Sequence, residues 1–473
     1  MTEVASLFFA KKNSSGFHCF LCKLFCYNEE EWGDNNVKIE EAINWIHSRL
    51  PFGSRPGLDR VEALLEVVGH PEEKVKTIHI AGTNGKGSTV TYLRYLLEEA
   101  GLTVGTFTSP YIESFNERIS INGQGIPDES LIRFVKKYQP LVEQMDQFEA
   151  VAGITEFETL TAMAFDYFLE EQVDVAIIEV GLGGLLDSTN VAKPLLTGIT
   201  TIGMDHTDIL GNTIEEIAAQ KAGIIKQNVP LVTGNIVPEA LAVIEKQAKL
   251  KNATQHVWGE AYTVSYKHPA EEWGEIFSFQ NEFGKIPKLT IHMIGRHQVE
   301  NAGMAIEMYQ IYCGLMNLPF REKDVINGLK KAQWPGRMER LSEEPLVILD
   351  GAHNTHAMAR LVQNLKQEFK GYHIHLLFSA LRTKEVDKML HQLQEVPDAT
   401  IYVTTFDYPK AIELSDIQAT TDEKVTIVSM WQFGLAEILE KMTAEDVLVV
   451  TGSLYFISEV RRLLVQLGGK NES

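Results

Sequence analysis

The residues best suited to chemistry lie in the stretch HIAGTNGKGST, which runs from His79 to Thr89. An apolar run before it predicts a strand, and TYLRYLLEEAG after it predicts a helix. A glycine-rich turn between a strand and a helix directs backbone N–H groups and the helix dipole at a phosphate, and Lys86 can neutralise its charge. These flanks favour a phosphate-binding loop over an ordinary glycine-rich turn with a solvated lysine. That loop would consist of Gly82, Thr83, Asn84, Gly85, Lys86, Gly87 and Ser88.

Polar side chains also end two other strand-like runs. Glu179 closes the run VDVAIIE, and Asp205, His206 and Asp208 follow the run TTIGM. Ligands collect at the carboxyl ends of strands in open parallel sheets, and a carboxylate there suits Mg²⁺. The alternatives are a glutamate in a structural salt bridge and a structural histidine. The position of His206 beside the predicted metal favours a functional role for it.

Two helical patterns follow Val37, and strand-like and helical patterns then alternate to about residue 200. They include LTVGTF, ETLTAMAFDYFLEEQ, VDVAIIEVG and PLLTGITTIG. Continuous apolar strands that alternate with helices indicate a parallel sheet covered on both faces. The alternation restarts near Met338 with PLVILD, THAMARLVQNLKQEF, HIHLLFSA, TIYVTTF, KVTIVSM and VLVVTG. The expected fold class is therefore α/β, with a mostly parallel sheet behind the phosphate loop and a smaller, Rossmann-like C-terminal α/β domain.

Length and charge limit the classes of partner. The chain has 473 residues, enough for two domains, and its 43 basic and 64 acidic residues give a net charge of −21. This charge argues against a nucleic-acid-binding surface. No apolar run is long enough to span a bilayer, and the N-terminal MTEVASLFFAKK has too short an apolar stretch for a signal peptide. We expect no nucleic-acid or membrane partner and a cytoplasmic location.

Residues 1–36 are an atypical leading segment without clear periodicity. Within it, His18, Cys19, Cys22 and Cys26 lie inside nine residues and could hold a zinc ion. No paired CxxC motif follows, so a disordered extension without metal is the favoured interpretation.

Eight motifs occur in the order and rough spacing of one known family. They are AGTNGKGST, TSPYIESFNERISING, TEFE, EVGLGGLLDSTN, DHTDILGNTIEEIAAQKAGIIK, WPGRMER, DGAHN and TGSLY. From about Val37 to Leu467 the chain resembles the folylpolyglutamate synthase and dihydrofolate synthase family, a branch of the Mur ligases. The resemblance implies an ATP-binding domain of the Mur ligase central type over residues 37–335 and a glutamate-ligase domain over residues 338–473.

The resemblance also implies roles for individual residues. Lys86 and its loop would hold the phosphates of ATP, and the nucleotide would also contact Asn301, Arg337 and Asp350. Two Mg²⁺ sites would use Ser109, Glu179, His206 and a carbamylated Lys221. A carbamate presents oxygens, which a hard cation requires, whereas from its sequence alone Lys221 reads as a helix-surface lysine. The folate and the incoming L-glutamate would meet Arg118, Asp187, His353, Ser453 and Tyr455, and the expected catalytic residues are Lys86, Lys221 and His353.

The reaction implied by the resemblance is ATP-dependent addition of L-glutamate to the glutamate carboxylate of a reduced folate, through an acyl phosphate, by a monomeric enzyme. A bifunctional enzyme that also acts on dihydropteroate is the alternative. This chain departs from the family pattern near Asp187, because it has Leu185 where many relatives have arginine. A Mur ligase for peptidoglycan precursors is a remoter alternative, since that branch usually carries an additional nucleotide-sugar domain. A non-catalytic nucleotide switch would need only the phosphate loop and Glu179.

Overall fold

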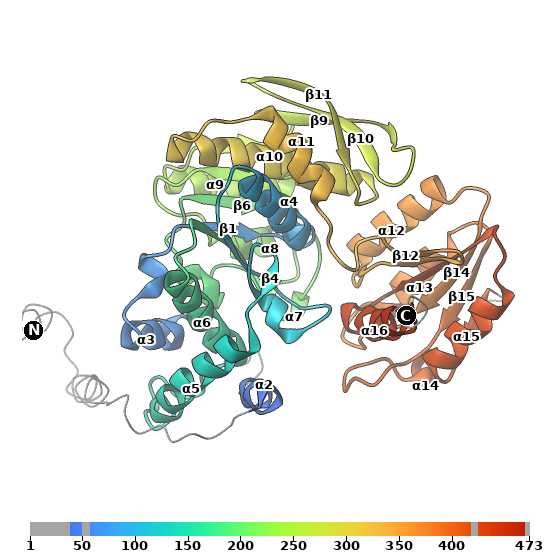
Figure 1. Ribbon diagram of the computed structural model, residues 1–473, viewed down its shortest axis with the longest axis horizontal. Helices are drawn as coiled ribbons and strands as arrows, with labels where there is room; N and C mark the ends of the chain where they lie inside the picture. Colours follow the sequence, from blue (N-terminus) through green and yellow to red (C-terminus); the bar gives the residue numbers. More distant parts are fainter. Residues whose placement is uncertain (1–37, 50–56, 418–423, 469–473) are drawn as a thin grey trace, which may run out of the picture.

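The computed structural model describes residues 38–49, 57–417 and 424–468. Figure 1 shows two lobes, a large lobe that runs from α2 to α11 and a C-terminal lobe that runs from β12 to α16. The predicted extension over residues 1–36, with its cysteine cluster, lies outside the described residues. Among the described helices, none has the length and apolar character required to cross a membrane.

The large lobe is built on an eight-stranded sheet in the order β4-β3-β2-β5-β1-β6-β7-β8. Strands from β2 across to β8 run parallel, and β3 and β4 add an antiparallel edge. The bounds are β1 (Thr77–Ala81), β2 (Val104–Phe107), β3 (Ile119–Ile121), β4 (Gln124–Gly125), β5 (Val175–Glu179), β6 (Leu196–Ile199), β7 (Leu231–Thr233) and β8 (Gln255–Val257). The mostly parallel sheet that the sequence predicted is confirmed.

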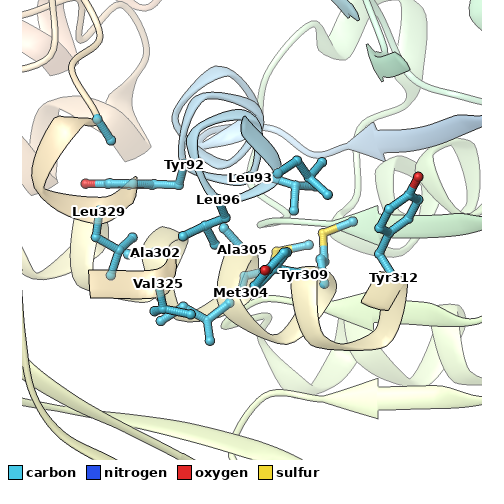
Figure 2. Close-up of a cluster of buried hydrophobic side chains, with 14 of the residues drawn as sticks. Tyr92, Leu93, Leu96, Ala302, Met304, Ala305, Tyr309, Tyr312, Val325 and Leu329 are labelled. Atoms are coloured by element: carbon cyan, nitrogen blue, oxygen red, sulfur yellow. The ribbon is translucent and has the colours of Figure 1, made fainter. Parts of the chain in front are cut away.

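Helices cover both faces of this sheet. Side chains of β5 alternate between two cores, because Ala176 and Ile178 face one cluster while Val175 and Ile177 face the other. The second core joins the sheet to α4, α10 and α11, as Figure 2 shows for Tyr92, Leu96, Ala302 and neighbouring side chains. The helices are α2 (Ile39–His47), α3 (Asp59–Val67), α4 (Lys86–Glu99), α5 (Asp128–Met145), α6 (Glu156–Glu170), α7 (Thr207–Leu210), α8 (Ile214–Ala222), α9 (Pro238–Leu250), α10 (Arg296–Met316) and α11 (Glu322–Lys331), with short 3-10 turns η2 (Pro71–Glu73), η3 (Phe115–Arg118) and η4 (Ser188–Val191).

A separate three-stranded antiparallel sheet, which the sequence did not predict, lies against α10 (Figure 1). It contains β9 (Tyr262–Pro269), β10 (Glu275–Asn281) and β11 (Gly284–Ile291). Phe277 and Phe279 of β10 are buried in the same core as α10, so this sheet extends the cover of the large lobe.

The C-terminal lobe has a six-stranded sheet in the order β12-β13-β17-β14-β15-β16, parallel except at β12. Its strands are β12 (Glu339–Glu343), β13 (Leu346–Leu349), β14 (His373–Phe378), β15 (Ala399–Val403), β16 (Val425–Ile427) and β17 (Asp446–Thr451). Its helices are α12 (Thr355–Glu368), α13 (Val386–Gln394), α14 (Leu414–Ile417), α15 (Trp431–Lys441) and α16 (Leu454–Gly468). This agrees with the predicted second α/β unit.

Candidate active site between the lobes

The phosphate loop starts where β1 ends, in the interior of the eight-stranded sheet. β1 lies between β5 and β6, and all five of its residues are buried. Gly85 adopts a φ of 85°, and α4 begins at Lys86. The first N–H groups of a helix have no partner within it and carry the positive end of the helix dipole. The loop therefore presents backbone donors to an anion at the carboxyl end of the sheet.

Neighbouring residues leave little or no room for a side chain at the three glycines of this loop. A Cβ atom at Gly82 would lie 1.9 Å from Oγ1 of Thr200, and one at Gly85 would lie 2.5 Å from Oδ1 of Asn301. A Cβ at Gly87 would lie 3.2 Å from Nε1 of Trp334, which belongs to the connection between the lobes. Each glycine thus permits a close contact with a different element.

Two threonines that follow β6 hold the loop in place, and they are not among the residues predicted from the sequence. Thr200 and Thr201 both donate their hydroxyl hydrogens to the carbonyl oxygen of Asn84, over 2.6 and 3.0 Å. The backbone N–H of Thr83 donates to the carbonyl of Thr201 over 2.8 Å. In the sequence these threonines read as ordinary strand residues, because threonine favours strands.

Two lysines converge on one carbonyl oxygen of the loop. Nζ of Lys86 lies 2.9 Å from the carbonyl oxygen of Gly82, and Nζ of Lys221 lies 3.1 Å from the same atom. Burial, and next the positive charge of Lys86, lower the pKa of Lys221 to about 7.

The interpretation of Lys221 as a helix-surface residue is wrong, because its side chain is buried, with the residue 4% exposed. Ile217, Ala218, Lys221 and Ala222 are the buried residues of α8 and share one helix face, which is the face turned to the protein interior.

Glu179 is the last residue of β5 and lies beside Ile80 of β1 in the sheet register. Its residue exposure is 4%, and Oε2 has no hydrogen-bond partner among the residues that the structure describes. Burial raises the pKa of Glu179 to about 7, although Lys86 and Arg337 act in the opposite direction. A buried carboxylate oxygen without a partner fits the needs of a bound cation, because an unpaired buried acceptor is costly.

Arg337 and Asp350 belong to the C-terminal side of the site. The carboxylate of Asp350 accepts backbone N–H groups from Met338 over 3.1 Å and from Ala352 over 3.0 Å. Burial raises the pKa of Asp350, and the nearby positive charge of Arg337 opposes this rise. Asp350 therefore shapes the turn after β13, close to Arg337.

One cavity of about 220 Å³ collects most of the predicted residues. Both lobes line it, so neither lobe alone forms its walls. The predicted residues that line it are Gly82 to Ser88 of the loop, Ser109, Glu179, His206, Lys221, Asn301, Arg337, Asp350 and His353. His297, Gln298, His356 and Arg360 also line it and were not predicted.

Four predicted substrate residues do not line this cavity. Arg118 makes an ion pair with Glu156 at 2.5 Å. The Asp187 carboxylate is buried and accepts the N–H of Leu182 over 2.8 Å and the N–H of Thr189 over 3.0 Å. Ser453 is buried before α16, and the partly exposed ring of Tyr455 stacks on Tyr408 with centroids 4.5 Å apart. Their predicted contacts with substrate remain predictions.

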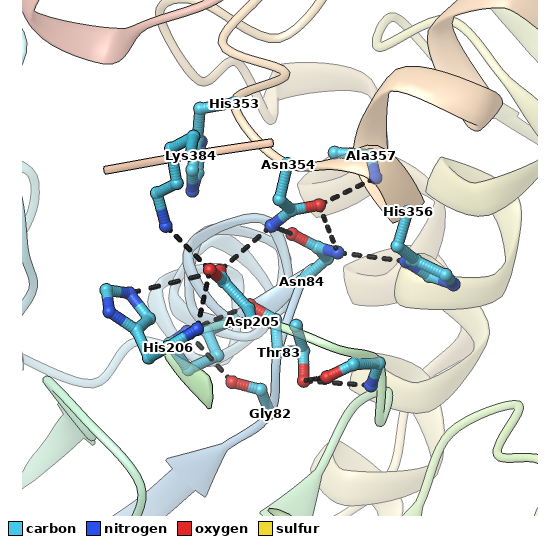
Figure 3. Close-up of polar contacts among 12 residues, drawn as sticks. Gly82, Thr83, Asn84, Asp205, His206, His353, Asn354, His356, Ala357 and Lys384 are labelled. Carbon is cyan, nitrogen blue, oxygen red and sulfur yellow. Dashed lines mark hydrogen bonds and ion pairs between the residues drawn. The ribbon is translucent and has the colours of Figure 1, made fainter. Parts of the chain in front are cut away.

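A polar network joins the phosphate loop to the C-terminal lobe (Figure 3). Asn84 and Asn354 exchange side-chain hydrogen bonds of 3.1 and 3.3 Å, and Asn354 also caps α12 by accepting the N–H of Ala357. Asn354 donates to Oδ2 of Asp205 over 3.0 Å, and Nζ of Lys384 donates to Oδ1 of Asp205 over 2.6 Å. Lys384 and Asn354 are not among the site residues predicted from the sequence.

His353 lies beside this network. Its Nδ1–H donates to the carbonyl oxygen of Gly351 over 2.8 Å, which leaves Nε2 as the acceptor nitrogen of a neutral ring. Burial and then the positive charge of Lys384 lower the pKa of His353 to about 4. The imidazole is therefore neutral at physiological pH.

Comparisons with known proteins agree with this arrangement. The family model of the Mur ligase middle domain matches residues 136–309, and the Mur ligase glutamate ligase domain matches residues 336–454. The dihydrofolate synthase/folylpolyglutamate synthase of Bacillus subtilis is 44% identical over 90% of this chain and 99% of its own length. The folylpolyglutamate synthase of Lacticaseibacillus casei is 36% identical over 92% of this chain and 100% of its own. A solved FPGS–AMPPCP–folate complex is similar with a TM-score of 0.80 and 34% identity, covering 90% of this chain and all of that one.

Proposed function

Because the chain belongs to the folylpolyglutamate synthase/dihydrofolate synthase family of the Mur ligases, we propose that it is an ATP-dependent ligase that adds L-glutamate to the glutamate carboxylate of a reduced folate. ADP and phosphate are the other products. The observation that carries this proposal is the single cavity in which a phosphate loop, two lysines and Glu179 of the large lobe meet Arg337, Asp350 and His353 of the C-terminal lobe. A nucleotide held there has its terminal phosphate between the lobes.

The chemistry needs an activated carboxylate, because a free carboxylate is a poor electrophile for an amine. The γ-phosphoryl group of ATP passes to the folate carboxylate, the amine of L-glutamate attacks the resulting acyl phosphate, and phosphate leaves. The loop N–H groups and Lys86 offset charge on the transferring group, so catalysis rests on positioning and electrostatics. Residues of both lobes then contribute to the same step.

A proton must leave the incoming amine, and we expect His353 to take part in its removal. Its Nε2 is the acceptor nitrogen, because Nδ1–H is donated to the carbonyl of Gly351. A low pKa makes this histidine a weak base, so we expect Nε2 to orient the amine by accepting its hydrogen bond and to pass the proton on to solvent water.

The finer assignments at the metal sites are part of the same proposal. Two Mg²⁺ ions would be held by Ser109, Glu179, His206 and a carbamate on Lys221, and when bound they would offset negative charge on the phosphates. The orphan Oε2 of Glu179 supports this ligand set. Lys221 is enclosed beside the loop with a pKa near 7, so much of its amine is in the neutral form that can react with carbon dioxide.

The proposal also includes the organisation of the chain. Residues 37–335 would form the ATP-binding domain and residues 338–473 the glutamate-ligase domain, with residues 1–36 as an appendage. We expect a monomer in the cytoplasm. Arg118, Asp187, Ser453 and Tyr455 would contact folate or glutamate once substrates are bound and the lobes have adjusted.

The test is ADP release with Mg²⁺, ATP and L-glutamate, with tetrahydrofolate and dihydropteroate compared as acceptors. Turnover with tetrahydrofolate supports the proposed function. Turnover with both acceptors would make the enzyme bifunctional, a second candidate favoured by the name of the Bacillus subtilis relative. No turnover with either acceptor would refute the proposal.

A further inference from the structure

The connection between β2 and β3, which we call the strap (residues 109–118), links two predicted site residues. It begins at Ser109, a predicted Mg²⁺ ligand that lines the cavity, and ends at Arg118, a predicted substrate contact. The side chain of Glu117 fixes its bend. Oε1 accepts the N–H groups of Glu113 and Ser114 over 2.8 and 2.6 Å, and Oε2 accepts that of Ile112 over 3.1 Å. The middle of the strap is therefore a compact turn rather than a loose loop.

The strap belongs to the large lobe by sequence but is docked on the C-terminal lobe. Ile112 is 4% exposed and is part of the apolar core that contains Leu454 and Ile457 of α16. The side chains of Ile112 and Ile457 both lie over Gly336, where a Cβ atom would be 3.4 and 2.7 Å from them. An apolar side chain buried in the core of the other lobe is a firm attachment.

Two polar contacts reinforce the same attachment. Oγ of Ser458 donates to the carbonyl oxygen of Ile112 over 2.6 Å. Arg461 makes an ion pair with Glu113 of the strap and a second one, at 2.8 Å, with Glu339 of β12. Arg461 is thus anchored within its own lobe by Glu339 and reaches the strap through Glu113.

From these contacts we propose that Ser458 and Arg461 are positioning residues, which set the strap and thereby place Ser109 and Arg118 for the reaction. This inference rests on the proposed function. The C-terminal lobe would then have two roles. It lines the cavity, and through α16 it holds the strap of the large lobe in the position that the reaction requires. α16 begins directly after Ser453, so the same helix links the strap to the predicted glutamate site.

The sharpest variant combines Ser458→Ala with Glu113→Gln. It removes both polar contacts but leaves Arg461 paired with Glu339 and leaves Ile112 in its core, so the C-terminal lobe keeps its own interactions. The matched control is Glu437→Gln, which breaks an exposed pair with Lys441 within α15. Hydrogen exchange of the amides of residues 112–114 is measured without ligands, together with Tm and with kcat and KM for ATP.

We expect about tenfold faster exchange at these three amides and about tenfold lower kcat/KM, with Tm within about 2 °C of the wild type. Glu113→Asp, with Ser458 intact, should recover most of the activity. Unchanged exchange, unchanged kinetics, or faster exchange throughout the C-terminal lobe with a lower Tm would each overturn the inference. Failure of the wild type to release ADP would refute the proposed function, whereas the exchange measurement would still decide whether α16 orders the strap.

Discussion

Replacing Lys384 with methionine tests whether the polar network between the lobes controls catalysis. Nζ of Lys384 lies 2.6 Å from Oδ1 of Asp205, and the two side chains are 13% and 10% exposed. Burial alone would raise the pKa of Asp205, but the ammonium group of Lys384 holds it well below its ordinary value. Methionine has a similar length and no charge, so the variant leaves a nearly buried carboxylate that keeps its hydrogen bond from Asn354 across the lobes.

The size of the effect follows from this burial. Removing one partner of a buried charge pair costs about 3 kcal/mol, within a range of roughly 2 to 5. If the lobes separate, water can reach the carboxylate and the penalty disappears. The variant therefore destabilises the closed arrangement, in which the two lobes are in contact, relative to the separated one. A penalty of about 3 kcal/mol on that arrangement corresponds to a roughly 100-fold lower kcat/KM. The phosphate loop should keep its conformation, because Thr200 and Thr201 of the large lobe also hold it.

The assay compares ADP release and nucleotide binding by Lys384→Met and by Lys388→Met. Lys388 is a matched control because its side chain is 70% exposed and pairs only with exposed Glu385 among the described residues. Adding Asp205→Asn to Lys384→Met should recover part of the loss, since no charge is then left unpaired. If Lys384→Met keeps kcat/KM within about threefold of the wild type, the network does not hold the catalytic arrangement and the reasoning fails.

Three other changes give separate expectations. Lys221→Ala should abolish ADP release without loss of fold, and intact-mass measurement of the wild type should detect a carbamate; substantial residual turnover would exclude the role. Gly85→Ala should weaken ATP binding at least tenfold, because φ is 85° and the new Cβ would meet Asn301; normal affinity would show that the loop can shift. Burial raises the pKa of Glu275 from its ordinary 4.5 to about 7, so stability should fall as pH rises from 4.5 through 7. Glu275→Gln keeps an acceptor for the N–H of Gly295 and should reduce the dependence of unfolding free energy on pH. An unchanged dependence would show that Glu275 does not cause it.

The fold was predictable wherever local pattern and tertiary structure agree. The run VDVAIIE had to be a buried strand, and the structure buries all of Val175–Glu179 between two helical layers. The sheet of β9 to β11 was not predictable in this way. Only Tyr262 of β9 is buried and most of its other residues are exposed, and its stability comes from pairing with β10 and from packing on α10. Such pairing depends on partners that no short window of sequence contains.

The candidate site also contains both residues that a local sequence pattern could predict and residues whose role depends on distant partners. Gly85, Lys86 and Glu179 could be proposed because strand ends and glycine-rich turns have direct chemical meaning. Lys384 could not, because RTKEV reads as a surface turn and its partner Asp205 lies 179 positions earlier in the chain. Burial of Lys221 was equally hidden, since the charged residues of α8 give no sign of which face meets the phosphate loop.

The contact between Gly87 and Trp334 has a practical consequence. The indole ring lies against the phosphate loop while its backbone belongs to the connection between the lobes, and Nε1 is buried without a hydrogen-bond partner among the described residues. Tryptophan emission depends on the polarity and quenching groups around the ring. Trp334 is therefore a natural fluorophore whose emission should respond both to nucleotide binding at the loop and to movement between the lobes. Subtracting the emission of a Trp334→Phe variant would isolate its signal from the other five tryptophans of the chain.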